Sequence, residues 1–122
     1  MRRKILALIM MITMIAEKNV YAAESRGIID TEDGVTYTVG ASCGTYRGMG
    51  YGRCVDASKG LSLTVEFSYR DYDGNWHTLK SSKGGTTYVE VKTDRGTSID
   101  QATKRVVSRL YIEGDVYCAE LE

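Results

Sequence analysis

Alternation of apolar and polar residues is clearest over residues 61–70 of this chain. The apolar positions are Leu61, Leu63, Val65, Phe67 and Tyr69, and the polar ones are Ser62, Thr64, Glu66, Ser68 and Arg70. Successive side chains of a β-strand point to opposite faces, so this pattern predicts a strand with one buried face and one solvated face. Asp73-Gly74 follows and is typical of a two-residue hairpin turn with positive φ at both residues. We therefore predict a β-hairpin that returns over residues 75–79.

Shorter alternating runs recur between turn signals along the rest of the chain. Residues 35–39, 86–93 and 116–121 each have the pattern of a strand, and a further short strand is predicted near 51–57. The glycine-rich stretch 44–52 predicts a loop. Six or seven short strands without long alternating helices indicate a single antiparallel β-sandwich, in which each strand presents one apolar face to the core.

The segment 98–113 fits two patterns. Ser98 and Gln101 have the spacing of a helix capping box, and apolar residues recur near helical spacing at positions 99, 102, 106 and 110. Apolar and polar residues also alternate from 106 to 112 in a run that is rich in β-branched residues. We favour a strand over residues 104–113, and a single helical turn before it is compatible with both interpretations.

The first residues have the pattern of an export signal. A basic start at 1–4 precedes an apolar run over 5–16, and small residues follow at Ala22 and Ala23. The apolar run is shorter than the ~18–20 residues that span a bilayer. We therefore predict a signal peptide over 1–22, cleaved after Ala22 or Ala23, in a secreted bacterial protein without stable membrane insertion after the leader is removed.

Removal of this leader leaves one domain. Residues 23–33 are polar and predict a loose N-terminal arm, although Ile28 and Ile29 could dock as a short edge strand. Residues 34–122 then form the β-sandwich domain. A chain of this length is sufficient for one modest hydrophobic core.

The charge balance argues against nucleic acid as a partner. The full chain has 16 basic and 16 acidic side chains, of which the predicted leader removes four basic and one acidic. Twelve basic and fifteen acidic side chains remain, a net charge of −3. Without a basic excess the domain can neither displace the counterions of phosphate groups nor act as a polybasic membrane-surface module.

Three cysteines allow one disulfide and one remaining thiol in an exported chain. Cys43 and Cys54 flank the predicted glycine-rich loop, and the chain-entropy model assigns ~3 kcal/mol to closing a loop of this size. We predict the Cys43–Cys54 disulfide, with a pairing that involves Cys118 as the alternative. An exposed Cys118 would allow intermolecular pairing. The cysteines lack the paired spacing of a zinc site.

Neither catalysis nor an obligatory cofactor is expected. His77 is the only histidine, and the chain contains no nucleophile signature such as GxSxG. Asp71, Asp73 and Asn75 resemble the start of a calcium-binding loop, whose alternating oxygen ligands suit this cation. The resemblance is partial, because glycine stands at the fourth position instead of the sixth and Ser82 stands where the loop needs glutamate. Calcium is therefore the alternative to a plain hairpin turn.

Aromatic residues at the predicted turns suggest a binding surface. Tyr46, Tyr51, Tyr72 and Trp76 lie in or beside loops, with His77 next to Trp76, and rings with polar tips often serve recognition. We expect a non-catalytic module that binds a carbohydrate, a peptide or a surface protein. Closure of the core by Tyr51 and Trp76 would also account for those two rings. A bacteriocin-like or surface-assembly protein that acts by association is the alternative function.

Overall fold

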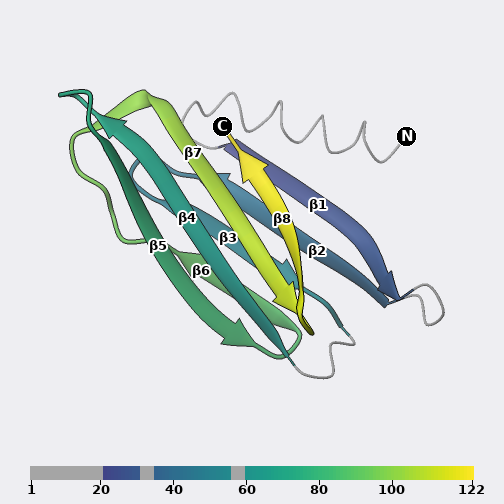
Figure 1. Ribbon diagram of the computed structural model, residues 1–122. Helices are drawn as coiled ribbons and strands as arrows, with labels where there is room; N and C mark the ends of the chain where they lie inside the picture. Colours follow the sequence, from purple (N-terminus) through teal and green to yellow (C-terminus); the bar gives the residue numbers. More distant parts are fainter. Residues whose placement is uncertain (1–20, 31–34, 56–59) are drawn as a thin grey trace, which may run out of the picture.

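The computed structural model describes residues 21–30, 35–55 and 60–122 of the protein. These residues form two four-stranded antiparallel sheets packed face to face (Figure 1). The strands are β1 (Tyr21–Asp30), β2 (Val35–Cys43), β3 (Gly48–Arg53), β4 (Leu61–Asp71), β5 (Trp76–Gly85), β6 (Tyr88–Lys92), β7 (Ile99–Ile112) and β8 (Asp115–Leu121). The predicted all-β class and antiparallel sandwich are confirmed, with eight strands where six or seven were expected.

The strand order is β1-β2-β3-β6 in the first sheet and β5-β4-β7-β8 in the second. The chain changes sheet after β3, after β5 and after β6, so β6 pairs with β3 and not with its neighbour in sequence. Figure 1 shows β4 and β7 at the centre of the nearer sheet, with β2 and β3 behind them. No helix in the described part of the chain has the length and apolar character needed to cross a bilayer.

β4 provides the centre of the core. Its odd-numbered residues from 61 to 69 are all buried, and its even-numbered residues from 62 to 70 face solvent or are half-buried. Buried side chains of β2, β6 and β7 pack against this face of β4. Burial of a large apolar side chain contributes roughly 1.5–3 kcal/mol relative to its exposure. The strand predicted from the alternation is therefore confirmed, and its buried face lies in the hydrophobic core.

β3 contradicts the predicted loop over residues 44–52. Every second residue of β3 is a glycine that faces the second sheet, and the residues between them face solvent. A Cβ atom added at Gly48 would lie 2.8 Å from the Cβ of Phe67, and one added at Gly50 would lie 2.7 Å from a methyl group of Val65. One added at Gly52 would overlap the Leu110 side chain. Glycine is needed on this face because the two sheets lie too close for any other residue.

Ser108 occupies the space that Gly50 leaves open. A Cβ atom at Gly50 would overlap the Ser108 Oγ atom. Ser108 is fully buried in β7, and its hydroxyl has no hydrogen-bond partner among the described residues. An unpaired buried hydroxyl reduces stability, so this serine is retained at a cost that close packing of the sheets must offset.

β1 replaces the loose arm predicted over residues 23–33. It pairs antiparallel with β2 along its length, from Tyr21 opposite Cys43 to Asp30 opposite Val35. Hydrogen bonds to the backbone of β2 hold β1 in the sheet, although the sequence of β1 is polar and has only a weak apolar pattern. Residues 31–33 of the predicted arm, and residues 1–20 of the predicted leader, lie outside the described residues.

The ambiguous segment is a strand. β7 begins at Ile99, five residues before the predicted start, and ends at Ile112. Its pairing with β4 shifts between Tyr69, which faces Lys104, and Asp71, which faces Ile99. The extra residues of this bulge lie where the alternative interpretation placed a helical turn. The shift bends β7 and lets its first residues approach the β4–β5 turn.

The β4–β5 turn differs from the predicted two-residue type. The Asp71 N–H donates to the Asn75 carbonyl at 2.9 Å and the Gly74 N–H donates to the Asp71 carbonyl at 3.0 Å, which closes a three-residue loop. Within this loop only Gly74 has positive φ, at 90°, as in a type I turn followed by a left-handed glycine. Positive φ at both central residues occurs instead between β7 and β8, at Glu113 and Gly114.

The close approach at Gly50 predicts the effect of a single added methyl group. Gly50→Ala should lower the free energy of unfolding by roughly 1–3 kcal/mol, because Val65 and Ser108 must move. Gly84→Ala in β5 is the matched control, since the nearest atom to its Cβ would be the Leu61 carbonyl oxygen at 3.5 Å. Denaturant unfolding of both variants measures the difference. Equal stability of the two variants would contradict close packing at β3.

Candidate functional site

Three connections gather at one end of the sandwich, which we call the loop end. It consists of the β2–β3 turn (residues 44–47), the β4–β5 turn (72–75) and the β6–β7 connection (93–98). The Tyr72 N–H donates to the Ser98 carbonyl at 3.1 Å, and the Gly96 N–H donates to the Tyr46 carbonyl at 2.7 Å. These hydrogen bonds join the β6–β7 connection to both turns. The loop end is therefore one continuous surface built from both sheets.

The β7 bulge adds further ties at this end. The Gln101 side-chain amide donates to the Thr45 carbonyl at 3.3 Å, and Lys104 Nζ donates to the Gly44 carbonyl at 3.2 Å. Lys104 also contacts Gln101 Oε1 at 2.8 Å. Gln101 was predicted only as part of a helix cap. Its observed role depends on a partner 56 residues away, which no local sequence signal could have indicated.

Asp71 organises the turn that carries the exposed rings. Its Oδ1 atom accepts hydrogen bonds from the N–H groups of Asp73 and Asn75, each at 2.9 Å. Its Oδ2 atom lies 2.8 Å from His77 Nε2. The hydrogen bond from His77, together with the two backbone N–H groups, lowers the pKa of the Asp71 carboxyl below its ordinary value. The turn is thus held by an ionised carboxylate at neutral pH.

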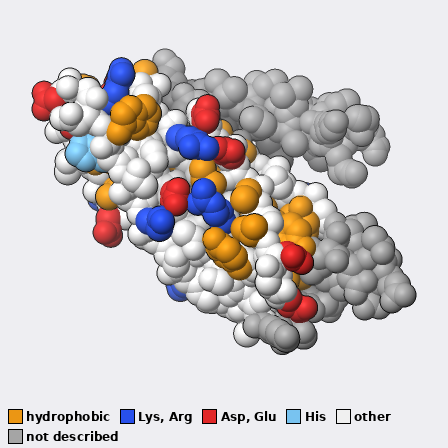
Figure 2. All heavy atoms as spheres, viewed as in Figure 1, with side chains coloured by type: hydrophobic (Ala, Val, Ile, Leu, Met, Phe, Trp, Pro, Cys, Tyr) orange, Lys and Arg blue, Asp and Glu red, His pale blue; other side chains and the backbone are white. Residues whose placement is uncertain are grey.

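The ring of His77 is held by Tyr69 as well as by Asp71. Its ring stacks on that of Tyr69, with ring centres 5.1 Å apart and planes 21° apart. Tyr69 is buried, and its hydroxyl oxygen accepts a hydrogen bond from the Thr97 N–H at 3.3 Å. The histidine is therefore fixed between the core and the turn while its edge is exposed to solvent. Figure 2 shows the single histidine beside apolar side chains at this end of the molecule.

Three of the predicted aromatic residues lie at the loop end. Tyr72 and Trp76, on the β4–β5 hairpin, are 74% and 59% exposed. Tyr46, in the β2–β3 turn, is 44% exposed, and the guanidinium of Arg95 lies 4.9 Å from its ring centre. Arg95 was not predicted as a site residue. Its position over Tyr46 is a cation–π contact that only the fold brings about, because 49 positions separate the two residues.

Tyr51 does not join this group. It lies on the outer face of β3, over Gly40, whose missing side chain leaves room for the ring. Its nearest aromatic neighbour is Tyr88 of β6, with ring centres 6.3 Å apart. The loop predicted over 44–52 would have placed Tyr51 near Tyr46. Because the segment is a strand, Tyr51 belongs to a sheet face and not to the loop end.

The predicted calcium ligands are engaged in holding the turn. Both oxygens of Asp71 have partners within the hairpin, and Asn75 contributes backbone groups to the same turn. Across residues 21–30, 35–55 and 60–122 there is no group of three His, Cys, Asp or Glu residues arranged to hold a metal ion. This geometry is that of an aspartate-capped turn, in which the side chain accepts backbone hydrogen bonds.

The predicted Cys43–Cys54 disulfide is absent, because Cys43 is a free thiol. Cys54 follows Arg53, which pairs with Thr38, and Thr38 lies five positions before Cys43 in β2. Cys54 lies one residue beyond Arg53, so the offset between the two cysteines is six residues. At ~3.4 Å per residue they are about 20 Å apart along the strands, whereas the Cα atoms of a disulfide lie about 4.4–6.8 Å apart. The prediction failed because the residues between them form strand and not a flexible loop.

The thiols of Cys43 and Cys118 lie in different environments. Burial raises the pKa of the Cys43 thiol, an effect that the nearby Lys104 only partly offsets. Cys43 therefore stays protonated and unreactive at neutral pH. Cys118 is a free and exposed thiol on the outer face of β8. The alternative expectation for Cys118, an exposed residue available to a second molecule, is compatible with this position.

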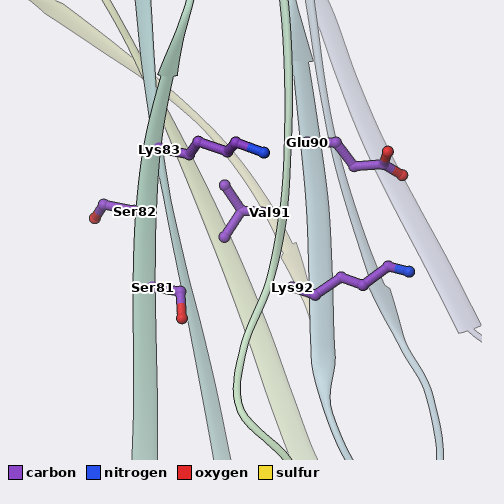
Figure 3. Close-up of a pocket in the computed structure, with 6 residues that line it drawn as sticks. All are labelled: Ser81, Ser82, Lys83, Glu90, Val91 and Lys92. Carbon is purple, nitrogen blue, oxygen red and sulfur yellow. The ribbon is translucent and has the colours of Figure 1, made fainter.

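A groove lies along a different part of the sandwich, between the edge strands β5 and β6. It has a volume of about 350 Å³ and is lined by Ser81, Ser82, Lys83, Glu90, Val91 and Lys92. Figure 3 shows Lys83 and Val91 directed into the gap between the two strands, whereas Glu90 and Lys92 point away from it. None of the predicted site residues lines this groove, so it is separate from the loop end.

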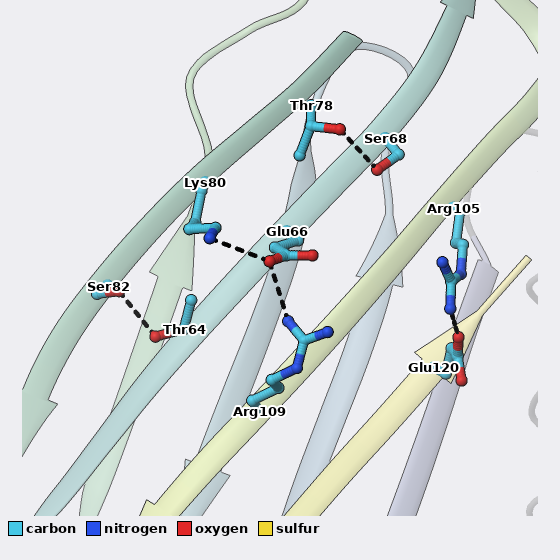
Figure 4. A network of polar contacts seen from close by, with 9 residues as sticks. All are labelled: Thr64, Glu66, Ser68, Thr78, Lys80, Ser82, Arg105, Arg109 and Glu120. Atoms are coloured by element: carbon cyan, nitrogen blue, oxygen red, sulfur yellow. Dashed lines mark hydrogen bonds and ion pairs between the residues drawn. The ribbon is translucent and has the colours of Figure 1, made fainter. Parts of the chain in front are cut away.

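The outer face of the second sheet carries a network of polar contacts (Figure 4). Glu66 lies 3.2 Å from Lys80 and 3.1 Å from Arg109, on the strands at either side of β4. Desolvation alone would raise the pKa of the Glu66 carboxyl, but the hydrogen bonds from Lys80 and Arg109 outweigh it and lower that pKa. Arg105 pairs with Glu120 across β7 and β8. These pairs align the strands and leave few uncompensated charges on this face.

The lowered pKa of Asp71 predicts an acid transition of the turn. Its contribution to stability is present above the ordinary aspartate pKa near 3.8 and is lost as the pH falls through the lower folded pKa. An NMR titration of the Asp71 carboxyl should therefore have a midpoint below 3.8. His77→Ala removes the largest cause of the shift and should move the midpoint upward. An unchanged midpoint in that variant would contradict the assigned contact.

Comparisons of this chain with protein families, with curated proteins and with solved structures found no match. The loop end therefore has to be interpreted from its own geometry. It combines exposed rings, an ionised carboxylate and a fixed histidine on connections from both sheets.

Proposed function

We propose that the protein is a non-catalytic binding module, exported by a bacterium, that recognises a carbohydrate, a peptide or a surface protein through its loop end. The observation that supports this function is the exposure of Tyr46, Tyr72 and Trp76 on connections that the fold brings together. Large rings with polar tips provide contact area to a ligand and also hydrogen bonds at their edges. Loops held on a rigid sandwich are a common place for such contacts.

The rigidity of the loop end favours recognition. Asp71 holds the β4–β5 turn by three hydrogen bonds, and Tyr46 is fixed by its backbone contact with Gly96 and by Arg95. A surface already ordered before binding loses less conformational entropy when the ligand arrives. Tyrosine and tryptophan also have few rotatable bonds, so their immobilisation costs little.

The charges around the rings do not select for a strongly charged ligand. Arg70 lies 3.5 Å from Asp100, and Asp71 accepts hydrogen bonds within its turn, so two carboxylates near the rings already have partners. Arg95 is engaged with the Tyr46 ring. A neutral or mixed-charge ligand suits this surface better than a polyanion, which would require a basic excess.

Export is the part of the proposal that concerns the N-terminus. The expected cuts after Ala22 or Ala23 fall within the first three residues of β1, so most of the strand would remain after cleavage. Intact mass measurement of protein recovered from the culture medium should give a chain that begins at residue 23 or 24. Recovery of the uncleaved chain from the cells alone would contradict export.

Alanine substitutions at the loop end test the binding function. Tyr72→Ala and Trp76→Ala should each weaken binding to cell-envelope material or to an arrayed glycan by about tenfold or more, as for central aromatic contacts. Tyr88→Ala is the matched control, because its ring is exposed but lies away from the loop end. Pull-down of the purified protein measures the effect. Equal binding by all three variants would sink the proposal.

A further inference from the structure

The four edge strands of the sandwich differ in how they are protected against pairing. β1 and β6 are the edges of the first sheet, and β5 and β8 are the edges of the second. β1 carries Arg26, β5 carries Lys80 and Lys83, and β6 has only five residues, the last of which is Lys92. Lysine side chains and short length both discourage the addition of another strand. β8 has seven residues and contains no Lys, Arg or Pro.

The outer edge of β8 is available in the part of the chain that the structure describes. β8 pairs with β7 on one side, and no described strand pairs with its other side. Its N–H and C=O groups on that side therefore require water or another strand as partners. This edge is the one on which a strand of compatible sequence would add to the second sheet.

We propose that β8 pairs antiparallel with β8 of a second copy of this chain, so that two sandwiches form a two-fold dimer with one continuous eight-stranded sheet. In an antiparallel pair, alternate residues of each strand direct their N–H and C=O groups toward the partner strand. The two copies are identical, so these residues have the same parity in both, and the numbers of two facing residues add to an even number. In a two-fold pair one residue therefore lies opposite its own copy. Full overlap of Asp115–Leu121 makes Cys118, the central residue, that residue.

This register is free of like-charge opposition. Asp115 faces Leu121 of the second copy, Val116 faces Glu120 of the second copy, and Tyr117 faces Ala119 of the second copy. A register centred on Glu120 would instead place two carboxylates directly opposite each other, which is unfavourable. Every other symmetric register leaves residues at the strand ends unpaired. The fully overlapped register is thus both the longest and electrostatically acceptable.

The charges beside the edge are already paired within each copy, Arg109 with Glu66 and Glu120 with Arg105. Arg109 pairs with Cys118 in the sheet, so the central row of the dimer contains one arginine from each copy. On the same face, the next row on each side of the centre contains Glu120 of one copy and Val116 of the other. The carboxylate of Glu120 is already compensated by Arg105 (Figure 4), so pairing the edge does not bury an isolated charge.

Apolar side chains on the same face gain cover from the second copy. Val116 is 47% exposed and its cross-strand neighbour Tyr111 is 41% exposed. In the proposed register the aliphatic stem of Glu120 from the second copy lies next to Val116. Val107 of the second copy, which is opposite Glu120, extends the same row. Removing this apolar area from water favours association.

Cys118 provides a direct test of the register. Facing residues of an antiparallel pair have Cα atoms about 4.5 or 5.5 Å apart, and both separations suit a disulfide. Oxidised glutathione would accept the two electrons and two protons that the pair of thiols loses, giving one intermolecular disulfide and two reduced glutathione molecules. We expect the purified protein to form this disulfide readily, with Cys118 linked to Cys118 in the peptide map.

Ser82 supplies the matched control for the cross-linking. Ser82 pairs with Thr64, Thr64 with Arg109, and Arg109 with Cys118, so Ser82 and Cys118 lie in one row across the second sheet. Ser82 is also exposed but lies at the opposite edge. The double variant Cys118→Ser/Ser82→Cys therefore moves the thiol from the β8 edge to the lysine-bearing β5 edge. Cross-linking should be at least about tenfold slower in this variant, since β5 edges are not held together. Equal rates would overturn the proposal.

A second measurement does not depend on the thiol. Cys118→Ser should remain a concentration-dependent dimer in light scattering with size exclusion. Cys118→Ser/Val116→Glu should shift the dissociation constant upward by about tenfold or more, because the added carboxylate would lie opposite Glu120 of the second copy. Circular dichroism confirms that both variants are folded. A monomer at all concentrations up to about 1 mM, or a dimer that Val116→Glu leaves unchanged, would overturn the β8 interface. Capture of another protein on β8 without self-association would also overturn it.

Discussion

Contact between the two sheets across β3 is the constraint on which the rest of the sandwich depends. Glycine at positions 48, 50 and 52 lets the backbone of β3 approach Phe67, Val65 and Leu110 directly. Because β3 has no side chains on this face, its backbone makes close dispersion contacts with the side chains of the second sheet. No space then remains for added atoms. Ser108 shows the strength of this constraint, because its buried hydroxyl finds no hydrogen-bond partner in the described part of the chain and lies where a Cβ atom at Gly50 would overlap it.

The geometry of the loop end follows from the same packing. β4 is held between β5 and β7 along its whole length, and its last buried residue, Tyr69, supports the ring of His77. His77 in turn fixes Asp71, and Asp71 fixes the turn on which Tyr72 and Trp76 are displayed. The position of the exposed turn therefore depends on the buried Tyr69 through its stack with His77 and through the Asp71 carboxylate. A ligand at this end would meet side chains whose positions are already set.

Alternation in β4 was sufficient to predict its burial, and with the other runs to predict an antiparallel sandwich, because a half-buried strand has a period of two. The same reasoning failed for residues 44–52, where glycine was counted as a loop signal although Gly48, Gly50 and Gly52 all face the second sheet. That error also placed Tyr51 in a loop and brought Cys43 near Cys54. Contacts such as Tyr46 with Arg95 and Gln101 with Thr45 join distant segments, and no local pattern encodes them.

The alternation in β3 also determines how this strand can change by mutation. Every amino acid other than glycine carries a Cβ atom, so any missense change at Gly50 brings a carbon atom into space that Val65 and Ser108 already occupy. The neighbouring outward positions, Met49 and Tyr51, carry no such restriction. The six residues of β3 therefore alternate between glycine positions, where a substitution destabilises the sandwich, and outward positions, which can vary without cost to the core. A new outer surface could arise on β3 by single substitutions while its inner face stays unchanged.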